Sequence, residues 1–86
     1  MLKALANEQR LMILCNLIEE PLSVSELNRR VPLSQSALSQ HLARLRRDGI
    51  VSTRREAQTI YYRIADPAAL EIMATLYRLY CSSSAR

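Results

Sequence analysis

Residues 33–49 read LSQSALSQHLARLRRDG, which is the pattern of a helix with one apolar and one polar face. Ser34 is a favoured helix N-cap, and Gly49 stands where helices commonly end in a left-handed glycine. Leucines recur at i, i+4 and i+7, so they form one stripe along the helix. The leucines of this stripe are Leu38, Leu42 and Leu45. We therefore predict an amphipathic helix that begins after Ser34 and ends at Gly49.

Two further helices are predicted upstream. Asn7 can cap a helix that ends near Glu19. Ser23 and Glu26 have the spacing of a capping box, and the short helix that they open ends near Val31. A tight turn then leads into the amphipathic helix described above, which predicts a helix-turn-helix unit.

The pattern changes after the third helix. Ile50 to Thr53 and Thr59 to Ile64 are short runs of β-favouring residues, and the charged residues 54–58 separate them, which predicts a β-hairpin with a charged tip. Asp66 followed by Pro67 predicts the start of a last helix that runs to about Tyr80. The element order predicts a mainly α fold with a β-hairpin wing, a winged helix-turn-helix, in one domain over residues 1–86.

Composition limits the class of protein. Twelve Lys and Arg stand against eight Asp and Glu, and 49% of the residues are hydrophobic, which excludes a disordered chain. Two cysteines are too few for a secreted disulfide framework. Neither a signal peptide nor an apolar stretch of about 18 residues is present. We expect a folded cytoplasmic protein that does not enter the membrane.

Positive charge gathers in the middle of the chain, where eight arginines lie between Arg29 and Arg63. This clustering is typical of nucleic-acid binding, although arginine-rich helices are also ordinary solvated surfaces. The polar face of the third helix favours DNA, because short side chains accompany amide and guanidinium groups that match base edges. An ordinary surface helix would carry more acids. The predicted DNA contacts are Ser34, Gln35, Ser36, Ser39, Gln40, His41, Arg44 and Arg47 on the helix and Arg54, Arg55, Gln58 and Tyr61 on the hairpin.

The sequence leaves the roles of His41 and of the two tyrosines Tyr61 and Tyr62 open. His41, at the edge of the leucine stripe, is a structural residue or a donor to DNA. A metal-ligand role is disfavoured because no Cys or acid stands at ligand spacing, so neither a metal nor another cofactor is expected. Tyr61 and Tyr62 alternate across their strand, so one packs inward and the other faces the DNA; the sequence does not decide which.

The last predicted helix is apolar around more than half of its circumference. A chain of 86 residues buries only about 60–65% of its unfolded surface, so a monomer has a small core. We expect a twofold homodimer through the terminal helices, which would present two recognition helices to a palindromic site in double-stranded DNA. The apolar positions of this helix are Leu70, Ile72, Met73, Ala74, Leu76, Tyr77, Leu79, Tyr80 and Cys81.

Three stretches of the chain carry a family resemblance: ALANEQRLMILC (4–15), LSQSALSQHLARLRRDGIV (33–51) and RREAQTIYY (54–62). Together they resemble the ArsR/SmtB family of bacterial winged-helix regulators. Metal sensors of that family carry Cys-x-Cys where this chain has Ser25 to Arg29, or acid and His ligands on the last helix, where this chain has Glu71 and no His. The resemblance is therefore to a non-metal branch. Family members usually begin with one more helix, of which Met1 to Ala6 would be the end.

Cys15 and Cys81 have two interpretations. Each shares a helical face with apolar residues, so each can be a small buried core residue. In sulfide-responsive members of the branch, cysteines on the corresponding helices join through a disulfide or polysulfide chain and release DNA. Carried over, the resemblance implies that Cys15 and Cys81 form a redox switch that answers an oxidant or a reactive sulfur species, which requires that they lie within bridging distance.

Two functions follow. The first is a homodimeric, sequence-specific transcriptional regulator whose DNA affinity is switched by oxidation or persulfidation of the two cysteines. The alternative is a transcriptional activator of the same branch that competes with a nucleoid silencer and whose cysteines are structural. The sequence does not separate an activator from a repressor. An enzyme is not expected, because neither a Cys-x-x-Cys motif nor a thiol beside a base is present.

Overall fold

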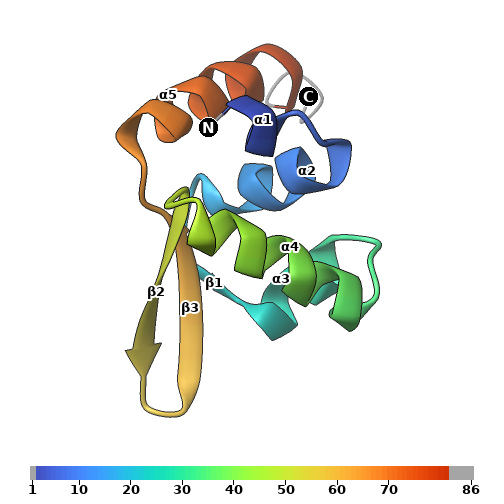
Figure 1. The fold of residues 1–86 in the computed structure, drawn as a ribbon, viewed down its shortest axis with the longest axis vertical. Coiled ribbons are helices and arrows are strands. Elements are labelled where there is room, and N and C mark those ends of the chain that lie inside the picture. Colours follow the sequence, from blue (N-terminus) through green and yellow to red (C-terminus); the bar gives the residue numbers. More distant parts are fainter. Residues whose placement is uncertain (1, 82–86) are drawn as a thin grey trace.

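The computed structural model describes residues 2–81, and the side chains of Leu2, Ala4, Tyr80 and Cys81 lie outside that description. Figure 1 shows α1, α2 and α5 at one end, α3 and α4 in the middle, and the β2–β3 hairpin projecting at the other end. This is the predicted winged helix-turn-helix architecture. The elements follow in the order α1 (Leu2–Leu5), α2 (Glu8–Leu17), β1 (Leu22–Ser23), α3 (Val24–Arg30), α4 (Gln35–Arg47), β2 (Val51–Glu56), β3 (Thr59–Ile64), α5 (Pro67–Leu76) and the π-helix η1 (Tyr77–Cys81).

The first two predicted helix starts are confirmed. The side-chain oxygen of Asn7 accepts hydrogen bonds from the backbone N–H groups of Gln9 (2.9 Å) and Arg10 (3.1 Å). In the capping box, the Glu26 N–H donates to Ser23 Oγ at 3.2 Å and the Ser23 N–H donates to Glu26 Oε1 at 2.9 Å. The bond from the Ser23 backbone stabilises the charged carboxylate and lowers the pKa of Glu26.

Helix α4 also begins and ends as predicted. Ser34 Oγ accepts a hydrogen bond from the Ala37 N–H at 3.1 Å, and Gly49 adopts φ +75° just after the helix. Because only glycine adopts such a conformation readily, Gly49 lets the chain turn into β2. All the leucines of the stripe are at most 1% exposed. Their burial leaves the polar face of α4 directed to solvent.

The wing differs from the predicted hairpin in two respects. Strand β2 extends to Glu56, so the turn consists of Ala57 and Gln58 instead of residues 54–58, and Ala57 takes a positive φ of 57°. The pairing of residues 54–56 with β3 outweighs their weak strand preference. The unpredicted strand β1 pairs antiparallel with β3, through Ser23 with Tyr61, and gives a sheet with the order β1-β3-β2.

Helix α5 closes the core. Asp66 caps it by accepting hydrogen bonds from the backbone N–H groups of Ala68 (2.8 Å) and Ala69 (3.2 Å), as predicted. Ala69 and Met73 are buried against the core, and the chain continues into η1, so helical structure covers the predicted length. No helix in the described part of the chain is long and apolar enough to span a bilayer.

Candidate nucleic-acid interface

The outward face of α4 is polar, basic and accessible. Because Leu38, Leu42 and Leu45 are buried, the opposite face of the helix is directed away from the core. Arg44 forms an ion pair with Asp48 at 3.3 Å near the end of the helix, where a cation also interacts favourably with the helix dipole. The predicted contacts on α4 that the structure leaves exposed are Gln35, Ser36, Ser39, Gln40, Arg44 and Arg47, and the N-cap Ser34 is exposed beside them.

The turn between α3 and α4 is held by a residue that the sequence did not single out. Asn28 Nδ2 donates a hydrogen bond to the carbonyl oxygen of Leu33 at 2.8 Å. This bond fixes the chain just before the Ser34 cap, so it sets where the N-terminus of α4 emerges. Buried Val31 lies in the same turn. An isolated Asn carries no sequence signal for such a contact, because its partner is a backbone carbonyl.

The wing has two faces, and they divide the predicted contacts. Tyr62 packs against the core, which places Arg55 and Ile60 on the same side of the sheet by strand alternation. Arg54 and Tyr61 therefore lie on the opposite face. The structure thus resolves the tyrosine alternative, with Tyr62 directed inward and Tyr61 outward.

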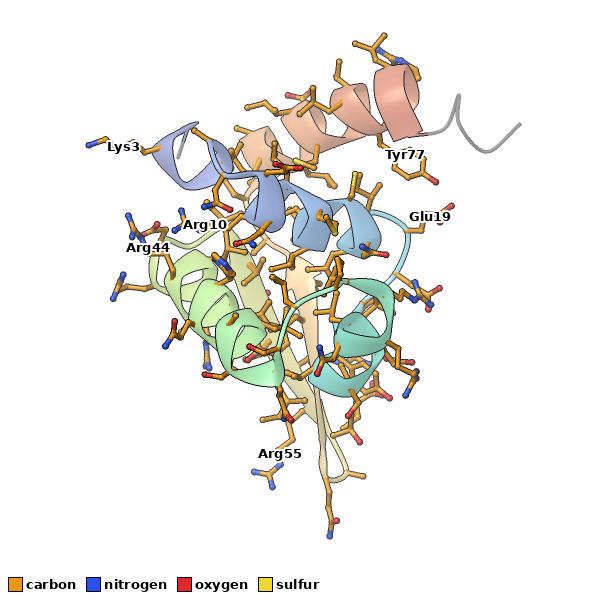
Figure 2. The ribbon with its side chains drawn as sticks, turned by 90° about the vertical axis from the view of Figure 1, so that its right-hand side faces the viewer. Lys3, Arg10, Glu19, Arg44, Arg55 and Tyr77 are labelled. Carbon is orange, nitrogen blue, oxygen red and sulfur yellow. The ribbon has the colours of Figure 1, made fainter. Side chains whose placement is uncertain are left out.

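The electrostatic surroundings of the two wing arginines also differ. Arg54 hydrogen-bonds and ion-pairs with Glu56, which raises the pKa of the guanidinium, and both residues line a hollow of about 260 Å³ with Tyr61. Arg55 Nε instead donates to the carbonyl oxygen of Ala57 at 3.3 Å. Figure 2 shows Arg55 near the wing tip, below α4. Neighbouring arginines in the sequence are thus not one cluster in space.

His41 is half-buried, and its ring contacts α2. Arg10 Nε donates a hydrogen bond to His41 Nδ1 at 3.3 Å, and His41 Nε2 lies 3.1 Å from Gln9 Oε1. The structure therefore favours the structural role for His41, and its contact with DNA stays a prediction. Among the side chains that the structure describes, no three potential metal ligands lie together.

Cys15 lies half-buried on α2 and packs against the core. The backbone of Cys81 forms the last residue of η1, but its thiol lies outside the described residues. Helix α2 contacts α5, the helix that leads into η1. The structure thus places Cys15 on a helix that touches the C-terminal helix, and the predicted pairing of the two thiols stays a prediction.

Helix α5 presents apolar side chains to solvent. Leu70 is 40% exposed and Leu79, on η1, is 56% exposed, while Ala74 is exposed between them. Met73 faces the core from the same helix and is buried. Large exposed aliphatic side chains on a terminal helix are typical of a surface that another chain covers.

A comparison with protein families matches residues 7–53 to the bacterial regulatory protein family arsR. The match includes α2, the helix-turn-helix and the start of the wing. The chain belongs to the ArsR family of bacterial regulatory proteins. It is a transcriptional regulator of this family and not an enzyme.

Several ArsR-family relatives cover nearly the whole chain. The transcriptional activator HlyU of Vibrio cholerae is 56% identical over 98% of this chain and 78% of its own length. The biofilm growth-associated repressor of Agrobacterium fabrum is 44% identical over 95% of this chain and 70% of its own length. The chain is thus similar to both an activator and a repressor.

Solved structures agree with the fold. Reduced HlyU from Vibrio cholerae superposes with a TM-score of 0.88 at 59% identity, covering 93% of this chain and 84% of that one. A homodimeric winged helix-turn-helix DNA-binding domain from Mycobacterium bovis superposes with a TM-score of 0.79 at 32% identity, covering 90% and 71%. The ArsR-family arrangement of helix-turn-helix and wing therefore holds for this chain.

Proposed function

We propose that this ArsR-family regulator binds a palindromic DNA site as a homodimer, with α4 in the major groove and the wing on the adjacent backbone. The exposed polar face of α4 carries the proposal. Gln40 and Arg44 have the groups that pair with adenine and guanine, and the small residues Ser36 and Ala43 let the helix approach the bases. Ser34 and the first N–H groups of α4 suit a DNA phosphate.

The exposed apolar side of α5 supports the homodimer. A twofold axis beside this helix would cover Leu70 and Leu79 with the same residues of a second copy. It would also set the two α4 helices about one turn of DNA apart. The homodimeric relative from Mycobacterium bovis has the same fold, which makes this the favoured assembly.

A thiol switch at Cys15 and Cys81 completes the proposal. Formation of the disulfide removes two protons and two electrons from the thiols, and a diazene oxidant such as diamide accepts both pairs. A persulfide donor RSSH would instead transfer its outer sulfur to a thiolate: the donor S–S bond breaks, a protein persulfide forms and the donor leaves as the thiolate RS⁻. Half-burial of Cys15 on a helix that contacts α5 supports this role, because a bond from α2 to the C-terminal helix would constrain both.

The second candidate function keeps the DNA binding and gives the cysteines a packing role. Contact of Cys15 with the core favours it, since a half-buried thiol among leucines is also an ordinary core residue. In that case this chain would activate transcription, as the name of the similar protein HlyU says of that relative.

Titration of fluorescent promoter DNA tests both candidates. Gln40→Ala is expected to weaken specific binding about tenfold, while Asn16→Ala, on α2 and outside both the polar face of α4 and the exposed side of α5, serves as the control. Unchanged affinity in Gln40→Ala would contradict the placement of α4. Diamide is expected to weaken binding of the wild type and not of Cys15→Ser. Equal affinity in every treated and reduced sample would leave the cysteines with a packing role only.

A further inference from the structure

A pair of side-chain hydrogen bonds links the recognition helix α4 to α2 through one histidine. Arg10 Nε lies 3.3 Å from His41 Nδ1, and Gln9 Oε1 lies 3.1 Å from His41 Nε2. Figure 2 shows Arg10 between these helices, on the side where α4 carries Arg44. Both ring nitrogens are therefore directed at α2 and not at the space in front of the polar face of α4.

The donors and acceptors of this contact agree with one another. A guanidinium N–H only donates, so His41 Nδ1 is the acceptor in this contact. The tautomer with its hydrogen on Nε2 fits the second contact, because that N–H can donate to the amide oxygen of Gln9. One tautomer of His41 thus satisfies both partners at once.

The partners on α2 are themselves fixed. Gln9 and Arg10 occupy the first turn of α2, and their backbone N–H groups donate to the Asn7 cap at 2.9 and 3.1 Å. On α4, His41 directly follows Gln40 and precedes Arg44 by three residues. The contact therefore runs from a capped helix start to the middle of α4, the helix that is proposed to bind DNA.

We propose that His41 is a positioning residue that sets the rotation of α4 against α2, and that Gln9 and Arg10 are its anchors. The inference rests on the proposed DNA binding by α4. Burial of the leucine stripe is non-directional and permits small rotations of α4. A hydrogen bond weakens steeply when its angle is poor, so the His41 bonds resist those rotations and keep Gln40 and Arg44 at the groove.

A double-mutant cycle tests the proposal through DNA affinity. Gln9→Ala removes an anchor without changing α4. Asn16→Ala is the matched control because, within the described residues, its amide donates to the Met12 oxygen of α2 itself. We expect Gln9→Ala to weaken binding about threefold to fivefold, and Asn16→Ala to leave it unchanged. In His41→Ala, added Gln9→Ala should have no further effect. If the loss of affinity in the double variant equals the product of the losses in the two single variants, the proposal is overturned. Equal affinities of Gln9→Ala and Asn16→Ala would also overturn it.

Two conservative variants separate the anchors. His41→Asn retains an acceptor for Arg10 and is too short to reach Gln9. Adding Gln9→Ala to His41→Asn should therefore cause no further loss of DNA affinity. His41→Gln retains a donor at the reach of Nε2, so Gln9→Ala should still weaken binding. A direct DNA contact by His41 predicts instead that Gln9→Ala has the same small effect in both backgrounds.

Amide hydrogen exchange in the free protein measures the link without DNA. In Gln9→Ala, the α4 backbone amides near His41 should exchange several-fold faster than the same amides in Asn16→Ala. Equal exchange in both variants would overturn the positioning role. If the wild type binds no promoter DNA, the proposed function fails and this measurement alone decides the role of His41.

Discussion

The opposite directions of Arg54 and Arg55 make a quantitative prediction for the wing. Arg55 lies on the face that continues from the core beneath α4, whereas Arg54 lies on the other face and is paired with Glu56. Replacement of Arg55 by Ala should therefore remove a phosphate contact. Replacement of Arg54 should remove one partner of an ion pair that is already neutral as a unit.

The magnitude follows from counterion release. Each phosphate contact contributes about 0.9 to the slope of log affinity against log salt, so Arg55→Ala should flatten that slope by about 0.9. Over an about fourfold change in salt, this corresponds to about a threefold difference in affinity. Arg54→Ala should change the slope by clearly less, because Arg54 lies on the opposite face of the wing and its guanidinium binds the Glu56 carboxylate instead of a phosphate.

Fluorescence anisotropy with one promoter duplex, at a series of KCl concentrations, measures both slopes. Specific and scrambled duplexes should show the same change, because a phosphate contact carries no sequence information. Equal slope changes for the two variants, or a larger change for Arg54→Ala, would refute the division of the wing into two faces.

Three other predictions concern stability and assembly. Leu42→Ala should lower the free energy of unfolding by about 2–5 kcal/mol, measured by urea denaturation, because it empties a fully buried site. Glu26 has a lowered pKa, so its stabilisation is present above the ordinary carboxyl pKa and is lost as pH falls through the lowered value. Glu26→Gln should remove that part of the acid dependence of Tm, and identical acid profiles would contradict it. Leu70→Glu should shift sedimentation toward the monomer, whereas an unchanged dimer would place the interface elsewhere.

Local signals explain how much of the fold the sequence predicts. The caps at Asn7, Ser23 and Ser34 and the stop at Gly49 each depend on residues within a few positions, and all are confirmed. Strand β1 was not predicted, because a strand of two residues shows no periodicity and its partner, β3, lies far along the chain. Pairing across the hairpin with residues 59–61 extended β2 through Glu56, against the weak strand preference of residues 54–56.

In the candidate interface, too, the features set by local sequence patterns were predictable and those set by contacts between elements were not. The exposed polar face of α4 is a matter of helical period, so its members were predictable from the leucine stripe. The split between Arg54 and Arg55 depends on the exact register of the wing, which the sequence left open. The link from Gln9 and Arg10 to His41 depends on how α2 crosses α4, and no local pattern encodes that crossing.

Ser23 has two roles, which together restrict how this chain can change in length. It pairs with Tyr61 in the sheet and also caps α3, so the wing and the helix-turn-helix share one residue. If one residue were inserted in β3 between Tyr61 and the turn, the β3 side chains between the insertion and the turn would move to the opposite face of the sheet. Related chains should therefore gain or lose wing residues in pairs at the Ala57 turn, and should vary most freely at the exposed residues 19–21, between the end of α2 and the start of β1.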